Sequence, residues 1–183
     1  MFRELGPWMV RRFGKGPVAE AFASLPVELS RGLDPSLPAF GALPATWYDA
    51  RIYQHVFDVL LAGRSELDQV SLARDAARTV LDQTLHGIYA KLFQLMASPS
   101  LYARYAQKMW DTHYDTGKIT IAHRAPNVAA HQVSGWAGHH PFVCAINRQS
   151  GVVVYSKMGL ENVRFESDRC SPPVCESVYA WDE

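Results

Sequence analysis

Three cysteines in the last forty residues carry the most distinctive chemistry of this chain. Cys144 follows His140-Pro-Phe-Val, whereas Cys170 and Cys175 flank the segment Ser-Pro-Pro-Val. Two adjacent prolines favour a tight turn, which would bring Cys170 and Cys175 together at the end of a β-hairpin. If the segment that carries Cys144 folds back onto this hairpin, the three sulfurs form a metal site or a redox pair. Otherwise they are three unrelated small apolar side chains.

A metal site would need a fourth donor beside the three sulfurs. Thiolates favour zinc in tetrahedral sites, and a carboxylate can complete the set. Glu166, Asp168 and Glu176 lie near the predicted hairpin. The candidate zinc ligands are Cys144, Cys170, Cys175 and Asp168. The alternative is that the cysteines bind no metal, and the weakly specific Cys-x4-Cys spacing by itself favours that alternative.

Motifs of the common catalytic classes are absent from the sequence. It contains no His-x-x-x-His pair, no Gly-x-Ser-x-Gly, no Walker loop and no Gly-x-Gly-x-x-Gly. A nucleophilic pair of His140 and Cys144 would lack an evident third group to orient it. We therefore favour a non-catalytic role over an enzyme.

Composition narrows the class of partner. Eighteen basic residues balance eighteen acidic ones, so the chain lacks the positive charge that nucleic-acid binding needs. No apolar run approaches the roughly 20 residues of a membrane-spanning helix. An odd number of cysteines without a secretion signal is typical of a reducing compartment, so we expect a cytoplasmic protein.

The elements that must position the cysteines follow from hydrophobic periodicity. Apolar residues recur at helical spacing up to about residue 114, and the period then changes to that of strands. Two strands are predicted on either side of Ala125-Pro-Asn, followed by a helix over Phe142–Met158 and two further strands. The prediction is an α+β fold, in which N-terminal helices pack on a four-stranded antiparallel sheet of β-β-α-β-β order. Residues 1–24 are predicted as a helical extension and residues 25–183 as a single α+β ligand-binding-like domain.

Several short motifs resemble a known family. They are Leu25-Pro-Val-Glu-Leu, Pro44-Ala-Thr-Trp-Tyr, Gly87-Ile-Tyr, Ser98-Pro, Trp110 and Tyr114-Asp-Thr-Gly. Together these motifs look like a myxobacterial paralogous family of unknown function. The C-terminal half is similar to the four-vinyl reductase domain, which is grouped with haem-NO-binding and TRAPP-type domains.

The resemblance also concerns the cysteines. In a metal-binding branch of these domains, a cysteine that opens a helix is followed by a carboxylate and by two further cysteines across a hairpin. The 26-residue separation of Cys144 and Cys170 keeps that spacing, but the carboxylate position falls on Ser167, next to Asp168. The haem-binding relatives carry a Tyr-x-Ser-x-Arg signature that is absent here, so no haem is expected.

The resemblance further implies an apolar pocket between helices and sheet, and dimerisation through N-terminal helices. We expect a homodimer. The residues expected to line the pocket are Ile88, Leu92, Leu95, Met109, Trp110, Ile121 and Val133.

The sequence leaves three functions open. The first is a non-catalytic ligand-sensing domain that binds a small apolar molecule and acts through a protein partner. The second is a protein-interaction adaptor with a filled core. The third, which we rank lowest, is an enzyme acting on a tetrapyrrole or another apolar substrate.

Overall fold

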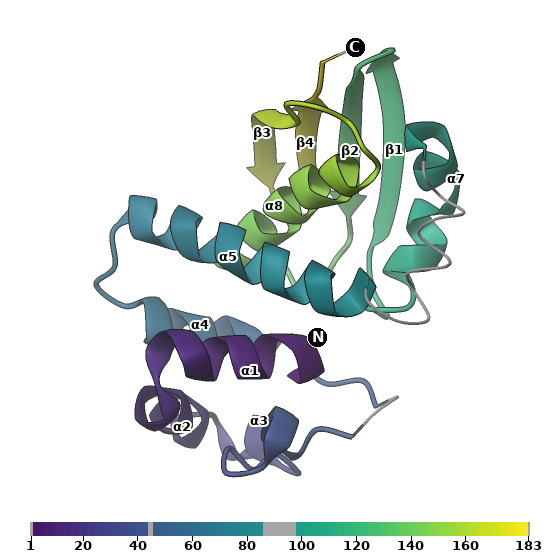
Figure 1. The fold of residues 1–183 in the computed structure, drawn as a ribbon. Helices are drawn as coiled ribbons and strands as arrows, with labels where there is room; N and C mark the ends of the chain where they lie inside the picture. The colour runs from purple at the N-terminus through teal and green to yellow at the C-terminus, as the bar shows by residue number, and fades with distance from the viewer. Residues whose placement is uncertain (1, 44–45, 86–97, 183) are drawn as a thin grey trace.

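A computed structural model describes residues 2–43, 46–85 and 98–182. Helices make up its N-terminal half, and the strands follow in the C-terminal half (Figure 1). The helices before the first strand are α1 (Phe2–Phe13), α2 (Lys15–Ala23), α3 (Val27–Ser30), the 3-10 helix η1 (Pro38–Gly41), α4 (Arg51–Leu61), α5 (Glu66–Leu85) and α7 (Pro99–Trp110). Among these described residues, no helix is long and apolar enough to cross a membrane.

One antiparallel sheet follows, and the helix α8 (Pro141–Lys157) is inserted between its two hairpins. The strand order across the sheet is β1-β2-β4-β3. The strands are β1 (Lys118–Ala125), β2 (Val128–Ser134), β3 (Arg164–Ser171) and β4 (Val174–Ala180). The predicted α+β class and the β-β-α-β-β order are therefore confirmed.

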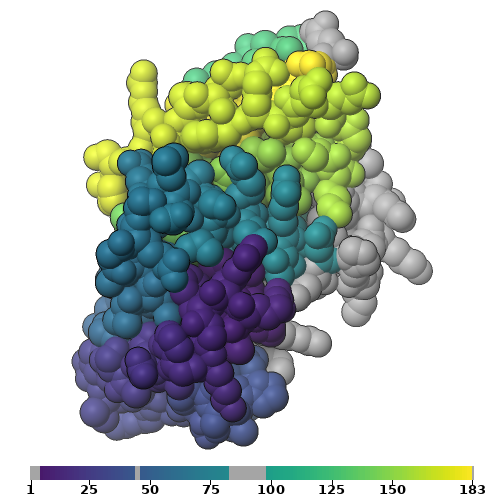
Figure 2. Space-filling model, turned by 60° about the vertical axis from the view of Figure 1, so that its left-hand side comes forward, coloured from purple at the N-terminus to yellow at the C-terminus, as the bar shows by residue number. Residues whose placement is uncertain are grey.

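The elements are stacked in layers. Helix α8 crosses one face of the sheet and packs on α5, which lies between α8 and the N-terminal helices (Figure 1). Figure 2 shows the same order on another side of the molecule, with α5 between the purple and blue N-terminal helices and the yellow-green C-terminal part. Helix α5 thus joins the helical half of the chain to the half that carries the sheet.

Helices α1 and α2 contribute to the main hydrophobic core. The Trp8 ring stacks on Phe142 of α8 with centroids 6.3 Å apart, and its Nε1 donates a hydrogen bond to Asp75 of α5. Phe22 of α2 packs on Phe40 at 4.2 Å. Trp8 and Phe22 are almost completely buried within this chain. The division at residue 25 into extension and domain stays a prediction, but the first 24 residues share their core with α4 and α8.

A second apolar cluster fixes α8 to the sheet. It contains Tyr155 of α8, Tyr179 of β4 and the terminal Trp181. A Cβ atom at Gly151 would overlap the Tyr179 ring, so the absence of a side chain at this position lets the helix approach β4. The Tyr179 hydroxyl donates to the carbonyl oxygen of Arg148 in the preceding turn of α8, 3.1 Å away.

A buried histidine lies within the same layer. His131 of β2 is 7% exposed, and its Nε2 lies 2.8 Å from the Tyr155 hydroxyl oxygen. Burial and, to a smaller extent, charge repulsion from His123 together lower the pKa of His131 to about 3. Folding therefore holds this imidazole in its neutral form.

This burial predicts a pH-dependent stability. The pKa of His131 in the unfolded chain is about 6.5, so between about pH 3 and pH 6.5 the unfolded state binds more protons than the folded state. The free energy of unfolding should fall as pH is lowered through that window, by up to about 1.4 kcal/mol per pH unit from this group. The free energy of unfolding of His131→Gln, measured by urea unfolding, should change less with pH than that of wild type. His55→Gln on α4, which is not among the groups that shift His131, is the matched control. Equal slopes for wild type and His131→Gln would contradict the assignment.

Candidate functional site

A partly open cavity of about 210 Å³ lies between α7, α8 and the covered face of the sheet. Residues on its sheet wall alternate along the strands, as side chains on one face must: Cys175, Ser177 and Tyr179 on β4, and His131 and Val133 on β2. Helix α7 contributes Tyr102, Ala106, Met109 and Trp110, and most of the lining is apolar.

Some of the residues expected from the sequence to line a pocket do line this cavity. Met109, Trp110 and Val133 line the cavity. Ile121 is the cross-strand partner of His131 but packs with the Tyr155–Tyr179 cluster, away from the cavity lining. The other three expected residues, Ile88, Leu92 and Leu95, lie outside the described residues.

One polar group in the wall lacks a partner. Asn147 of α8 lines the cavity, and its side-chain Nδ2 is buried without a hydrogen-bond partner among the described residues. Burial raises the pKa of Tyr114 above its usual range, and the nearby Asn147 side chain lowers it by less, although Nδ2 does not meet hydrogen-bond geometry with the phenol. A buried donor without an acceptor costs about 1–3 kcal/mol, so an acceptor oxygen placed in the cavity would be stabilised there. Sequence reasoning missed Asn147, because one asparagine within a helical pattern gives no signal of its own.

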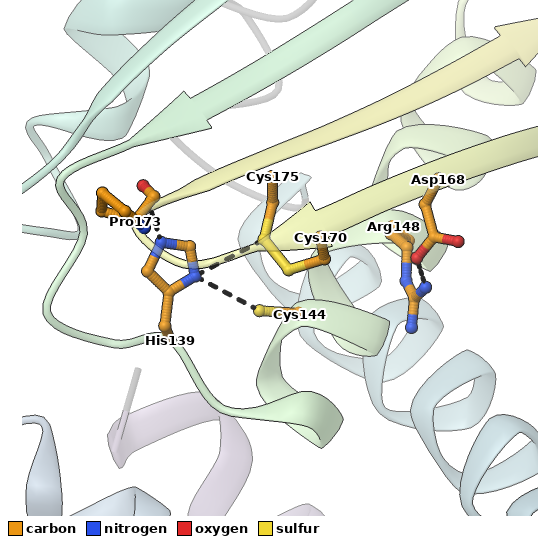
Figure 3. The surroundings of a disulfide bond; sticks show 7 residues. All are labelled: His139, Cys144, Arg148, Asp168, Cys170, Pro173 and Cys175. Carbon is orange, nitrogen blue, oxygen red and sulfur yellow. Dashed lines mark hydrogen bonds and ion pairs between the residues drawn. A yellow bond between two sulfur atoms is a disulfide. The ribbon is translucent and has the colours of Figure 1, made fainter.

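The three cysteines meet at the edge of this cavity. Cys170 and Cys175 are direct cross-strand partners in the β3–β4 hairpin and form a disulfide. Cys144, in the first turn of α8, has a free thiol that faces them (Figure 3). The tight turn predicted from Pro172-Pro173 joins the two strands as expected.

His139 joins the cysteines as a fourth donor. Its Nδ1 lies 3.7 Å from the Cys144 sulfur and 3.6 Å from the Cys175 sulfur, and the ligand atoms of the four residues lie within 4.8 Å of one another. Its Nε2 lies 3.3 Å from the carbonyl oxygen of Pro173. Because a carbonyl can only accept, Nε2 carries the proton and Nδ1 presents its lone pair to the sulfurs.

Asp168 has a different partner. Its carboxylate forms an ion pair with Arg148, which α8 presents one turn after Cys144 (Figure 3). It is absent from the group of donor atoms around the disulfide. The sequence offered a usable signal for His139 instead, since Pro141 begins a helix directly after the two histidines and Cys144 then falls in its first turn.

The site can therefore support two kinds of chemistry. The cavity can hold a small apolar molecule with a hydrogen-bond acceptor. The donor group can undergo thiol–disulfide exchange or, if the disulfide is reduced, could hold a soft metal ion through three sulfurs and one imidazole nitrogen.

Comparison with known proteins shows that this chain shares its fold with solved structures. No family model and no curated protein sequence matches the chain. Among solved structures, the Fe(II) unliganded H-NOX protein from K. algicida is 10% identical, with a TM-score of 0.65, covering 100% of this chain and 95% of that one. An oxygen-binding H-NOX domain related to soluble guanylate cyclases, in its oxygen complex, is 8% identical with a TM-score of 0.60, covering 97% and 91%. A structure described as "Modulating Heme Redox Potential Through Protein-Induced Porphyrin Distortion" is 9% identical with a TM-score of 0.62, covering 99% and 97%.

These structures correct one expectation from the sequence. The missing Tyr-x-Ser-x-Arg signature led us to expect no haem, but solved structures with this fold include one whose description names heme. The expectation is therefore overturned, and the cysteine cluster that suggested zinc does not by itself identify that metal. The resemblance to haem-NO-binding domains is confirmed at the level of the fold, which this chain shares with H-NOX domains.

Proposed function

We propose that this chain is a ligand-sensing domain that binds a small, mainly apolar molecule in the cavity between α7, α8 and the sheet. The observation that carries this proposal is a partly open, largely apolar cavity with an unpaired amide donor, Asn147 Nδ2, in its wall. An ordinary core packs to the density of organic crystals and leaves few voids larger than a water molecule. The adaptor hypothesis requires such a filled core, so the cavity favours the sensor.

The size and polarity of the cavity indicate the class of ligand. An apolar cavity of about 150 Å³ is enough to bind benzene, so a volume of about 210 Å³ suits a molecule of roughly one aromatic ring with a small substituent. The Asn147 amide favours a substituent with an acceptor oxygen. We therefore propose monocyclic aromatic carbonyl compounds and phenols as the first ligand class to test.

Haem is the cofactor named in the description of a structural neighbour, and the described wall does not accommodate it as it stands. The cavity is below the roughly 300–1,000 Å³ of pockets for drug-sized ligands. The three described histidine rings on the wall already have partners: His113 the Thr112 hydroxyl, His131 the Tyr155 hydroxyl, and His139 the Pro173 carbonyl. His86 lies outside the described residues. Haem is therefore included in the binding test rather than built into the proposal.

Signal output is proposed to pass through a protein partner in the cytoplasm. Several large apolar side chains outside the core are exposed, among them Leu37, Leu43 and Trp47 in the segment between α3 and α4. Exposed apolar surface is the usual basis of protein contacts. The relationships to the myxobacterial family and to four-vinyl reductase and TRAPP-type domains stay predictions.

Filling the cavity tests the sensor proposal. Ala106 of α7 is buried and lines the cavity, so Ala106→Phe should occupy the ligand space at little cost in stability. Thermal melts with a panel of phenols, aromatic ketones and haem should show a ligand shift in wild type that Ala106→Phe loses. Ala103→Phe, on the same helix but outside the lining, is the matched control and should keep the shift.

Two results would contradict the sensor proposal. The first is a fall of about 1–3 kcal/mol in the free energy of unfolding of Ala106→Phe, which would indicate an overpacked core. The second is the absence of any melt shift in wild type across the whole panel. Both together would make the adaptor the better account, whereas a haem absorption band with one haem per chain would replace the proposed ligand class.

A second candidate function is soft-metal binding by the reduced protein. At metal–ligand distances of about 2.0 Å for nitrogen and 2.3 Å for sulfur, the nitrogen–sulfur edge of a tetrahedron is about 3.5 Å. The two distances from His139 Nδ1 to sulfur, 3.6 and 3.7 Å, match that edge. The second ring nitrogen is oriented by a carbonyl, as is usual for metal-ligating histidines. The proposed ligands are Cys144, Cys170, Cys175 and His139, in place of the Asp168 predicted from sequence.

Exchanging the fourth ligand tests this candidate. Reduced protein dialysed against Co²⁺ should retain about one ion per chain by elemental analysis, and His139→Ala should weaken binding at least tenfold. Asp168→Asn, which removes only the partner of Arg148, should leave the metal content unchanged. Loss of metal in Asp168→Asn with retention in His139→Ala would restore the original assignment, and a metal-free wild type would exclude both sets.

We also propose a homodimer, as the sequence resemblance implies. The apolar N-terminal residues Trp8 and Phe22 are buried inside the chain, so the contact must use other surface, such as that around Trp47. Light scattering of the full chain at micromolar concentration should give about twice the monomer mass of 20.5 kDa. Trp47→Ser should shift this equilibrium toward monomer, and a 20.5 kDa species alone in wild type would contradict the dimer.

A further inference from the structure

The disulfide of the β3–β4 hairpin has a third sulfur beside it. Cys144 Sγ, the sulfurs of Cys170 and Cys175, and a ring nitrogen of His139 all lie within 4.8 Å of one another (Figure 3). A disulfide isomerises when a thiolate attacks one of its sulfurs. This arrangement supplies the attacking thiol, the disulfide and a proton acceptor without any outside component.

The proton of the Cys144 thiol has a defined acceptor. His139 Nδ1 lies 3.7 Å from Cys144 Sγ, and the bond from Nε2 to the Pro173 carbonyl keeps the Nδ1 lone pair on the side of the sulfurs. Only the thiolate form of a cysteine is the nucleophile, so the thiol needs such an acceptor before it can attack. Its place in the first turn of α8 favours the thiolate once the proton has moved.

We propose that this cluster is a thiol–disulfide exchange site in which Cys144 displaces Cys170 from Cys175. His139 Nδ1 takes the Cys144 proton as Cys144 Sγ attacks Cys175 Sγ. The Cys144–Cys175 bond forms, the Cys170–Cys175 bond breaks, and Cys170 leaves with the electron pair and then takes a proton from His139. One thiol and one disulfide are present before and after the step, so atoms and electrons balance without an oxidant or a reductant.

The surroundings of the two disulfide sulfurs favour attack at Cys175. Cys170 is exposed, so water solvates its thiolate as it leaves, whereas Cys175 is half-buried. His139 Nδ1 also lies 3.6 Å from the Cys175 sulfur, at the place where the new bond forms. Attack at Cys170 would instead release a thiolate with less access to solvent.

The exchange would change what the disulfide connects. The Cys170–Cys175 bond links two neighbouring strands of one hairpin, whereas a Cys144–Cys175 bond would fasten the start of α8 to β4. All three cysteines line the cavity, so the exchange would alter its rim. This coupling to ligand binding rests on the proposed sensor function, but the exchange itself does not. It would also present an exposed thiol at Cys170 for reaction with a low-molecular-weight disulfide.

Trapping the released thiol tests the proposal on the full oxidised chain. The protein, freed of metal with a chelator, is incubated with N-ethylmaleimide at neutral pH and quenched in acid at timed intervals. It is then digested for disulfide mapping by mass spectrometry. We expect alkylated Cys170 and a Cys144–Cys175 disulfide to accumulate together. Alkylated Cys144 with an intact Cys170–Cys175 disulfide at every time point would overturn the proposal.

Variants assign the roles of the residues. Cys144→Ser should keep the Cys170–Cys175 disulfide and take up no reagent. His139→Gln should slow the appearance of alkylated Cys170 by at least about tenfold, since general bases contribute about 10²–10⁴-fold. The exposed His123→Gln is the matched control, and equal rates in the two histidine variants would remove His139 from the step. Failure of the exchange would leave the ligand-induced melt shift of wild type intact, so it is distinguishable from failure of the sensor function.

Discussion

The close packing of α8 between α5 and the sheet is the constraint on which the other features depend. The approach to β4 is possible because Gly151 has no side chain where the Tyr179 ring passes. With the helix held there, residues three and four positions apart point the same way. Cys144 and Asn147 therefore both reach the cavity, Cys144 toward the hairpin disulfide and Asn147 toward the interior. A side chain at residue 151 would have to displace the ring or the helix, and either movement would disturb both features.

Most of the polar groups discussed in this interior are hydrogen-bonded or ion-paired within the fold, whereas one amide donor is not. His131 and Tyr155 satisfy each other inside the aromatic cluster, and burial keeps the imidazole neutral. Arg148 and Asp168 pair between α8 and β3. The Asn147 Nδ2 donor has no hydrogen-bond partner among the described residues, although native proteins leave few buried polar groups unpaired. An unpaired donor beside an apolar cavity is what a binding site for a small oxygen-containing molecule requires.

The fold shared with H-NOX domains does not fix what occupies the cavity of this chain. Identity to those structures is 8–10%, so the overlap concerns backbone arrangement rather than particular side chains. In this chain the described histidines on the wall bond to hydroxyl and carbonyl groups. The cysteines on the rim add the proposed thiol–disulfide exchange to the proposed ligand site.

Local sequence determined most of the secondary structure and the class of the fold. The change from helical to alternating periodicity near residue 115 placed the sheet in the C-terminal half, and Pro172-Pro173 set the hairpin turn that makes Cys170 and Cys175 cross-strand partners. Ser98, directly before a proline, caps α7 by accepting the Leu101 amide hydrogen. These signals are readable because each depends on residues only a few positions apart.

Tertiary structure alone decided which distant groups meet. His139 and Cys175 are 36 residues apart, and the loop before α8 must reach the hairpin turn for the Pro173 carbonyl to orient the imidazole. Asp168 was the fourth ligand predicted from the sequence, but α8 places Arg148 opposite its carboxylate. The cavity and the unpaired Asn147 amide likewise exist only because α7, α8 and the sheet leave space between them. Volume and hydrogen-bond satisfaction are properties of the packed chain, and no short stretch of sequence contains them.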